Sequence, residues 1–284
     1  DYRGYFKGDL LYYTTPEVVD ICLELVQKHV NLKDRKLLEP CAGTGEFVKG
    51  FQRIGVKDDD IVCLDIEPKH PMVTKGNYLE TNLDHKSFIS ITNPPFGRAS
   101  SLAKKFFNHA AEHSDYICYL IPKAWRKWST QNALNKSFHL VADIDVPDNC
   151  FYLPDGSKKD SSVLKTVFQI WEKKNNDRDI IVLDTTHNDW EFLKFGPIDS
   201  NNQPTPPQGA DFALRAYGGK CGDIIQTNLD ILRPKSWHWI KSKIELSVLI
   251  ARFKSLDYAL SQNTARQNSI GRGELVKLYT DTYN

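Results

Sequence analysis

The chain has 284 residues, of which 40% are hydrophobic and 26% charged, the composition of a globular protein with a sizeable core. This composition excludes a disordered, collagenous or coiled-coil protein. No apolar run reaches the ~20 residues of a transmembrane helix, and residues 1–10 lack the basic-then-apolar pattern of a secretory signal. The six cysteines contain no Cys-x-x-Cys pair. We therefore expect a cytoplasmic protein, or a nuclear one if its source is eukaryotic, with no disulfide framework, metal site or membrane partner.

The net charge of +1 favours no partner, but positive charge is unevenly distributed along the chain. Residues 98–136 contain seven Lys and Arg against two Asp and Glu, and residues 201–284 contain eleven against seven. This distribution fits a surface that faces a polyanion, and it fits ordinary solvated helix faces equally well.

Short apolar runs alternate with amphipathic stretches over the first part of the chain. The apolar runs predict strands at 36–40, 60–65, 87–92, 116–121 and 163–171. Between them, the spacing of apolar residues predicts helices at 46–53 and 102–113. This alternation predicts an α/β fold with a doubly wound, mostly parallel sheet, which binds ligands beyond the carboxyl ends of its strands.

The sequence changes character after a charged turn at 172–178. We therefore divide the chain into a domain at 1–178 and a C-terminal extension at 179–284. Residues 197–209 contain four prolines and predict a loop, whereas the helical spacing at 237–256 and 269–279 predicts helices.

Two glycines follow the first predicted strand, in Glu39-Pro40-Cys41-Ala42-Gly43-Thr44-Gly45. Glycines here let the backbone approach a ligand and leave N–H groups free at the helix start. A cofactor site and a simple tight turn explain this segment about equally well. Asp65 ends the next predicted strand, where a carboxylate can bind both hydroxyls of a ribose. A helix cap or a solvated acid is the alternative for Asp65.

Asn93-Pro94-Pro95-Phe96 follows the third predicted strand. The prolines stiffen the loop and donate no hydrogen bonds, so carbonyl oxygens remain as acceptors. If the Asn93 side chain and the Pro94 carbonyl accept both hydrogens of an aromatic amine, its lone pair is freed for methyl transfer, and the acceptors stabilise the developing positive charge. Phe96 would stack on the base, a contact that contributes about 1–3 kcal/mol.

These three segments together resemble those of the N6-adenine DNA methyltransferases in which the cofactor motif precedes the Asn-Pro-Pro-aromatic motif. The resemblance extends over about residues 6–175. Upstream, residues 12–19 are similar to the segment that closes over the methionine end of the cofactor. Asn77 stands where the family usually has an acid, and residues 116–125 are similar to the strand-plus-proline motif that follows. Residues 150–152 are similar to the segment whose aromatic side chain packs against the flipped base.

The resemblance implies a Rossmann-like class I methyltransferase fold and S-adenosylmethionine as cofactor. Glu39 and Gly43 would lie near the amino-acid end of the cofactor, Asp65 on its ribose and Ile66 against its adenine. The full set of implied cofactor-binding residues is Thr14, Thr15, Pro16, Glu39, Pro40, Ala42, Gly43, Gly45, Asp65, Ile66, Asn77, Tyr78 and Asn93. The implied catalytic residues are Asn93, Pro94, Pro95 and Phe96.

The target implied by the resemblance is adenine in DNA, either flipped out of a duplex or in a single strand. Expected contacts with the nucleic acid and the flipped base come from Lys123, Trp125, Arg126, Lys127 and Phe151. The extension at 179–284 is small for a target-recognition domain, so recognition is simple or a partner subunit contributes to it. A restriction-modification system is one setting for such an enzyme, and a solitary enzyme is another.

Other patterns have competing explanations. His109-Ala110-Ala111-Glu112-His113 matches a zinc-binding H-x-x-E-H pattern, but no third ligand is evident, so a surface pair of histidines is favoured. The basic and aromatic run 125–128 suits a loop that faces DNA, and a solvated turn is the alternative. Residues 215–222 form a second phosphate-contacting loop or an ordinary hairpin. The aromatic residues at 237–239 favour packing over a cofactor site.

Two further functions compete with DNA adenine methylation. An Asn-Pro-Pro loop also suits an RNA adenine or a protein glutamine side chain as methyl acceptor. The other alternative, a catalytically silent nucleic-acid-binding partner with the same fold, is disfavoured because Gly43, Asp65 and Asn93 are intact.

Overall fold

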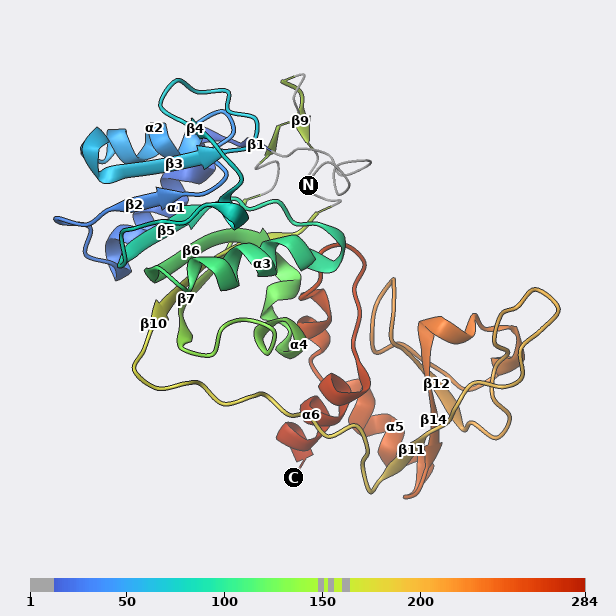
Figure 1. Ribbon diagram of the computed structural model, residues 1–284. Coiled ribbons are helices and arrows are strands. Elements are labelled where there is room, and N and C mark those ends of the chain that lie inside the picture. Colours follow the sequence, from blue (N-terminus) through green and yellow to red (C-terminus); the bar gives the residue numbers. More distant parts are fainter. Residues whose placement is uncertain (1–12, 148–150, 153–155, 160–163, 284) are drawn as a thin grey trace. The chain divides into compact units, whose positions relative to one another are not determined.

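The computed structural model describes residues 13–147, 151–152, 156–159 and 164–283 (Figure 1). The chain divides into two compact units, Asp1–Ile180 and Ile181–Asn284. Among the residues described, none of the helices combines the length and the apolar character needed to cross a membrane.

The largest sheet described in the first unit has seven strands. Its spatial order is β4 (Thr74–Lys75), β3 (Ile61–Asp65), β2 (Leu37–Glu39), β5 (Phe88–Thr92), β6 (Ser114–Pro122), β10 (Thr166–Lys173) and β7 (Phe138–Asp145). The strands from β4 to β6 are parallel, whereas β10 is antiparallel to both β6 and β7. The first five strands follow the 3-2-1-4-5 order of a doubly wound sheet. The predicted α/β, Rossmann-like fold is confirmed.

Helices cover both faces of this sheet, which explains why β2 and β5 are buried along their whole length. In Figure 1, α1 (Pro16–His29) and α2 (Glu46–Arg53) lie on one face and α3 (Ser101–Ala110) lies on the other. All five residues of β5 are buried. Because side chains alternate along a strand, Ile117, Tyr119 and Ile121 of β6 pack in the same cluster as α3, while Cys118 and Leu120 are buried on the opposite face.

Aromatic side chains dominate the core on the α3 side. The ring of Phe107 lies 5.6–6.0 Å from the rings of Tyr119, Trp125, Phe138 and Trp171, in edge-to-face arrangements. Trp125 belongs to the short 3-10 helix Lys123–Arg126 that follows β6, ahead of α4 (Trp128–Gln131), and its side chain is fully buried. The end of β6 is therefore fixed by packing.

A second sheet of the first unit joins β1 (Tyr13–Thr14), β8 (Phe151–Tyr152) and β9 (Lys158–Lys159). Tyr13 pairs with Tyr152 and Thr14 with Phe151, so residues about 138 positions apart are neighbours. The chain reaches β8 from the carboxyl end of β7 and returns to the start of β10. The small sheet therefore lies at the same edge of the large sheet as the carboxyl ends of its parallel strands.

The second unit has a described antiparallel sheet of four strands. Its order is β11 (Trp190–Phe192), β14 (Trp237–Ser242), β12 (Phe212–Arg215) and β13 (Ile224–Ile225). Side chains of this sheet share one core cluster with α5 (Leu246–Ser255) and α6 (Arg272–Tyr283). The indoles of Trp237 and Trp239 belong to a separate small cluster. This unit therefore has a hydrophobic core of its own.

Most predicted elements of the first unit exist within a few residues of their expected ends, although Val163, the first residue of the last predicted strand, lies outside the described residues. The helix predicted over 237–256 is wrong in its first part, because Trp237–Ser242 form the central strand β14 and only Leu246–Ser255 are helical. Pairing with β11 and β12 on both sides fixes this segment as a strand. The strand β7 and the helix α1 were not predicted.

The burial of Trp125 predicts a large difference between two neighbouring tryptophans. Trp125→Ala should lower the free energy of unfolding by about 3–5 kcal/mol, because it leaves a cavity among the rings around Phe107. Trp128→Ala should change it by about 0.5 kcal/mol or less, because the Trp128 side chain is 39% exposed. Urea unfolding of both variants measures the difference; equal losses of stability would contradict the packing described here.

Candidate functional site

The three sequence motifs meet at the carboxyl edge of the large sheet. Glu39 ends β2, Asp65 ends β3, and Asn93 follows β5 directly. The backbone N–H of Gly43 donates a hydrogen bond of 2.8 Å to Oδ2 of Asp65. The thiol of Cys41 donates to the backbone oxygen of Asn93, with a distance of 3.3 Å from Sγ to oxygen. The structure therefore brings the glycine turn, the acid and the Asn-Pro-Pro loop together.

A buried hydrogen-bond network joins β2 to β5 beneath this edge. The carboxyl group of Glu39 accepts hydrogen bonds from the hydroxyl of Thr92 and from the backbone N–H of Cys41. Sγ of Cys41 lies 2.9 Å from Oγ1 of Thr92. Glu39 is 1% exposed and Thr92 is fully buried. Thr92 thus contacts both the first motif and, through its chain neighbour Asn93, the third.

Burial raises the pKa of Glu39 to about 8, and the hydrogen bonds from Thr92 and Cys41 offset only part of that effect. The nearby carboxylate of Asp65 raises it further. Burial likewise raises the pKa of the Cys41 thiol well above its usual range. Near neutral pH the network therefore holds a protonated carboxyl and a thiol, and an incoming positive charge would favour ionisation of Glu39.

The two glycines of the turn serve different purposes. Gly43 has a φ of +50° and Gly45 a φ of +78°, a region that favours glycine. A Cβ atom on Gly45 would lie 2.6 Å from Cγ of His70, so only glycine fits under that ring at the start of α2. Gly43 is the residue whose N–H group binds Asp65.

Asp65 holds the turn from the neighbouring strand. Its two carboxylate oxygens accept separate backbone hydrogen bonds, Oδ2 from Gly43 and Oδ1 from Glu67 at 2.7 Å. The side chain is half-buried, and each oxygen has capacity for a second hydrogen bond. Asp65 is therefore a structural anchor of the turn as well as an available acceptor.

The Asn-Pro-Pro-Phe loop is fixed on the following helix. The backbone oxygen of Phe96 accepts hydrogen bonds from the N–H groups of Leu102 and Ala103, at 3.2 and 3.4 Å. Between them, Gly97, Ala99 and Ser100 all have positive φ values, of +66°, +51° and +58°. Pro94 is buried, and the Phe96 ring packs half-buried against the α3 core cluster. The loop is therefore a sharp, supported turn.

Tyrosines of the small sheet lie over the glycine turn. The hydroxyls of Thr44 and Tyr152 are 2.9 Å apart, and the rings of Tyr13 and Tyr152 are 5.4 Å apart. Lys69 donates to the hydroxyl of Tyr13 at 2.7 Å. The predicted segments at 12–19 and 150–152 thus meet at this turn, although Tyr12 and Cys150 lie outside the described residues. Sequence reasoning did not single out Thr92 or Lys69, which no motif marks.

The remaining predicted cofactor residues divide into surface and core positions. Thr14 and Thr15 are buried at the start of α1 and Pro16 is exposed. Asn77 is adjacent to Asp65 through the Gly76 N–H bond to the Asp65 backbone oxygen, and its own side chain accepts from the N–H of Leu79. Tyr78 is 1% exposed, so any contact with a cofactor from this position would come from its backbone.

The hydroxyl of Tyr78 lies 2.8 Å from Nε2 of His113. Burial lowers the pKa of His113 to about 4, so this histidine is a neutral core residue and the expectation of a surface pair fails for it. Within the described part of the chain, no group of three or more His, Cys, Asp or Glu side chains is placed to hold a metal ion.

Four of the predicted nucleic-acid contacts are engaged elsewhere. Trp125 is fully buried, so it does not stack on a nucleic acid. Arg126 binds Asp143 and, at 2.8 Å, Asp145, which also pairs with Lys123. Phe151 is fully buried at the small sheet. The acids that pair with Lys123 and Arg126 lie on β7, a strand that was not predicted.

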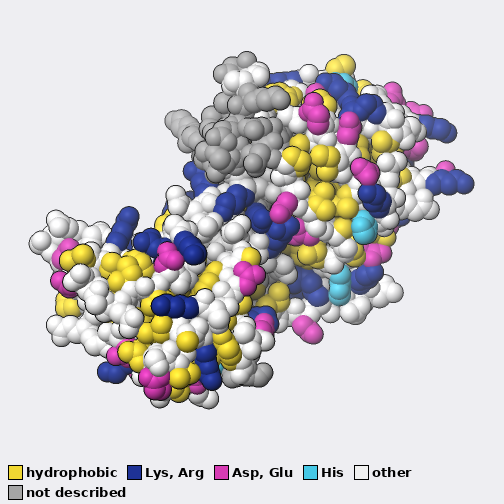
Figure 2. Space-filling view, turned by 180° about the vertical axis from the view of Figure 1, so that it is seen from behind, with side chains coloured by type: hydrophobic (Ala, Val, Ile, Leu, Met, Phe, Trp, Pro, Cys, Tyr) yellow, Lys and Arg dark blue, Asp and Glu magenta, His cyan; other side chains and the backbone are white. Residues whose placement is uncertain are grey.

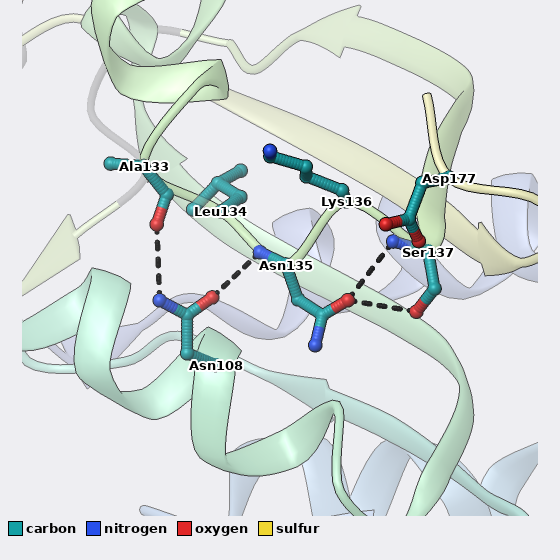
Figure 3. A pocket seen from close by; sticks show the side chains of 7 residues that line it. All are labelled: Asn108, Ala133, Leu134, Asn135, Lys136, Ser137 and Asp177. Carbon is teal, nitrogen blue, oxygen red and sulfur yellow. Dashed lines mark hydrogen bonds between the residues drawn. The ribbon is translucent and has the colours of Figure 1, made fainter. Parts of the chain in front are cut away.

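The hollow shown in Figure 3 lies away from these motifs. It measures about 620 Å³ and is open to solvent, lined by Asn108, Ala133, Leu134, Asn135, Lys136, Ser137 and Asp177. Its amides are used internally: Asn108 binds the backbone of Ala133 and Asn135, at 3.0 and 2.8 Å. We therefore place the candidate site at the carboxyl edge of the sheet.

No protein-family model matches this sequence, and no curated protein matches it either. Several solved structures are similar. A type I restriction-modification methyltransferase subunit from Streptococcus thermophilus is 14% identical, with a TM-score of 0.43 over 72% of this chain and 52% of its own. The magnesium protoporphyrin IX methyltransferase ChlM from Synechocystis PCC 6803, solved with bound S-adenosylmethionine (SAM), is 12% identical. Its TM-score is 0.42, and the match covers 56% of this chain and 79% of ChlM. The 23S rRNA methyltransferase ErmE is 12% identical, with a TM-score of 0.39 over 59% and 71%.

The raised pKa of Glu39 predicts a specific pH dependence of stability. Because the folded state keeps its proton up to about pH 8 while the unfolded chain loses it near the usual value of 4.5, the free energy of unfolding should fall as pH rises between these values. The slope approaches ~1.4 kcal/mol per pH unit. Glu39→Gln cannot titrate, so the wild type should lose stability relative to this variant from about pH 5 to pH 8.

Urea unfolding at several pH values measures this difference. Glu67→Gln, at an exposed position of the same edge, serves as the control and should follow the wild-type pH profile. Parallel pH profiles for the wild type and Glu39→Gln would show that Glu39 is ionised in the folded protein.

Proposed function

We propose that the chain is an S-adenosylmethionine-dependent methyltransferase that acts on the exocyclic N6 amine of adenine in DNA, with the target base flipped out of a duplex or taken from a single strand. The observation that carries the proposal is the position of Asn93-Pro94-Pro95-Phe96. This rigid loop follows β5 and is joined through Cys41 and Thr92 to the glycine turn and to Glu39.

The residues at this edge fit the cofactor by their chemistry. Glu39 is a buried acceptor suited to an ammonium group, and Asp65 has acceptor capacity for ribose hydroxyls. The start of α2 favours a carboxylate, and Ile66 offers apolar surface for an adenine ring. S-adenosylmethionine would supply an electrophilic methyl group whose bonding electrons remain on the sulfur.

The loop would activate the acceptor amine. The side-chain oxygen of Asn93 and the backbone oxygen of Pro94 would accept the two amine hydrogens, which draws the nitrogen toward tetrahedral geometry and frees its lone pair. These oxygens are fixed before the reaction, so they stabilise the positive charge on nitrogen without reorganising. Phe96 would hold the base by stacking. One amine proton then leaves to water.

The similar structures differ in their printed descriptions, so they do not identify the methyl acceptor of this chain. One similar structure is a subunit of a restriction-modification system and another is a 23S rRNA methyltransferase. We favour adenine in DNA because the order of the sequence motifs resembles that of the N6-adenine DNA methyltransferases. We assign target recognition to the C-terminal unit, with or without a partner subunit.

The direct test is a methyl-transfer assay with labelled S-adenosylmethionine and competing DNA, RNA and protein substrates. We expect label in DNA, recovered as N6-methyladenine after digestion to nucleosides. Label in RNA or in glutamine would replace the DNA assignment, and absence of any transfer beside an active control enzyme would overturn the proposal.

Asn93→Ala should separate chemistry from cofactor binding. The variant loses the side-chain acceptor for the amine, so the rate of methyl transfer should fall by at least about 10²-fold. Calorimetry should show cofactor affinity within about threefold of the wild type, a shift of ~0.6 kcal/mol. Phe96→Tyr keeps an aromatic face for stacking, so this variant should lose much less activity than Asn93→Ala. Full turnover by Asn93→Ala would remove the mechanism.

A further inference from the structure

A basic surface of the C-terminal unit lies outside the candidate site. Three segments meet there: residues 215–222, residues 233–236 and residues 266–269. The N–H groups of Ala216 and Tyr217 both donate to the backbone oxygen of Ser236, at 2.9 and 3.1 Å, and the N–H of Gly218 donates to that of Asn268 at 2.9 Å. These bonds hold the three segments side by side.

Five cations and one exposed aromatic ring lie on these segments. The Tyr217 side chain is 50% exposed. Around it, the segments carry Arg215, Lys220, Arg233, Lys235 and Arg266, all exposed or half-exposed. We call these six residues the Tyr217 surface.

The charge of this surface is not neutralised locally. The segments at 215–222, 233–236 and 266–269 contain no acid, although Asp223 directly follows the first segment and Asp230 precedes the second by three positions. Among the described residues, none of the five cations forms an ion pair: Lys235 donates to the amide oxygen of Gln203, and Arg215 lies 4.4 Å from the Trp237 ring centre. Figure 2 shows one face of the molecule, with Lys and Arg side chains in dark blue and Asp and Glu side chains in magenta.

The loop that carries Tyr217 has two glycines, so a ligand can come close to its backbone. Gly218 and Gly219 follow the tyrosine with φ values of +66° and +57°. Atoms of the Arg215 side chain, from Cδ to the guanidinium, lie 3.4–3.7 Å from where a Cβ atom on Gly219 would stand. The turn thus places backbone without side chains between a tyrosine ring, a guanidinium and the Lys220 ammonium.

We propose that the Tyr217 surface binds a nucleic-acid strand, with a base stacked on Tyr217 and the phosphates on either side bound by the five cations. Cations that flank an exposed aromatic ring are the arrangement that binds unstacked strands, whereas the Asp and Glu side chains of an acidic peptide offer no aromatic ring to stack on Tyr217. This inference deepens the proposed function, on which it rests, by naming where the C-terminal unit contacts the nucleic acid.

The test is binding of fluorescein-labelled oligonucleotides of about 20 nucleotides to the full chain without cofactor, measured by anisotropy. Arms with single-stranded DNA, single-stranded RNA and duplex DNA identify the strand. The triple variant Lys220→Glu, Lys235→Glu, Arg266→Glu should bind at least about tenfold more weakly. It should also reduce the slope of log affinity against log salt by about two, since each phosphate contact contributes ~0.7 for single strands.

Lys243→Glu is the matched control for charge. Lys243 is exposed and directly follows β14 (Trp237–Ser242), at the end opposite Trp237 and so about 20 Å from the Tyr217 surface. It should leave both affinity and slope within error of the wild type. Equal effects of Lys243→Glu and of a single reversal, Lys220→Glu, would mean that net charge alone determines binding and would overturn the proposal.

Tyr217 separates stacking from charge. Tyr217→Ala should weaken binding of single strands by about tenfold with no change in salt slope, and Tyr217→Phe should restore it. Wild-type affinity in the triple variant, or equal binding of polyglutamate and oligonucleotide, would overturn the inference. If the wild-type chain bound oligonucleotides as expected but transferred no methyl group, the proposed function alone would be overturned.

Discussion

The hydrogen bond between Thr92 and the buried carboxyl of Glu39 is the constraint on which the candidate site depends. It joins the last residues of β2 and β5, the two strands that carry the glycine turn and the Asn-Pro-Pro loop. Burying a carboxyl group is costly unless it is neutral or fully hydrogen-bonded, so the fold retains this group at an energetic cost. Ligands of parallel sheets bind at the carboxyl ends of the strands. A destabilising buried carboxyl group at such a strand end is therefore typical of a functional site rather than of a residue that stabilises the fold.

The motif-bearing parts of the site could be predicted because they are local. The turn at 39–45 depends on residues next to each other in the sequence, and Gly43 and Gly45 have the positive φ values that such a turn requires. Parallel pairing of β2, β3 and β5 then aligns three strand ends at one edge. The relative positions of Gly43, Asp65 and Asn93 follow from strand order and needed no knowledge of side-chain contacts.

The surroundings of Lys123, Trp125 and Arg126, which the sequence suggested as nucleic-acid contacts, could not be predicted in the same way because they depend on distant residues. Residues 125–128 have a basic and aromatic sequence, but β7 contributes Asp143 and Asp145, which bind Arg126, and the α3 core buries Trp125. Residues 237–242 illustrate the same limit. Their apolar spacing fits a helix, and only pairing with two neighbouring strands makes them β14.

The cations of the two units therefore differ in whether acids pair with them. In the first unit, Lys123 and Arg126 are paired with acids from another strand, so at these two positions the positive charge is neutralised. In the second, the cations around Tyr217 stay unpaired among the described residues while the core packs independently through α5 and α6. Because each unit has its own core, changes at the Tyr217 surface should act on strand binding without disturbing the buried network at Glu39. The proposed methyl transfer and the proposed strand binding thus depend on structural elements that can be altered separately.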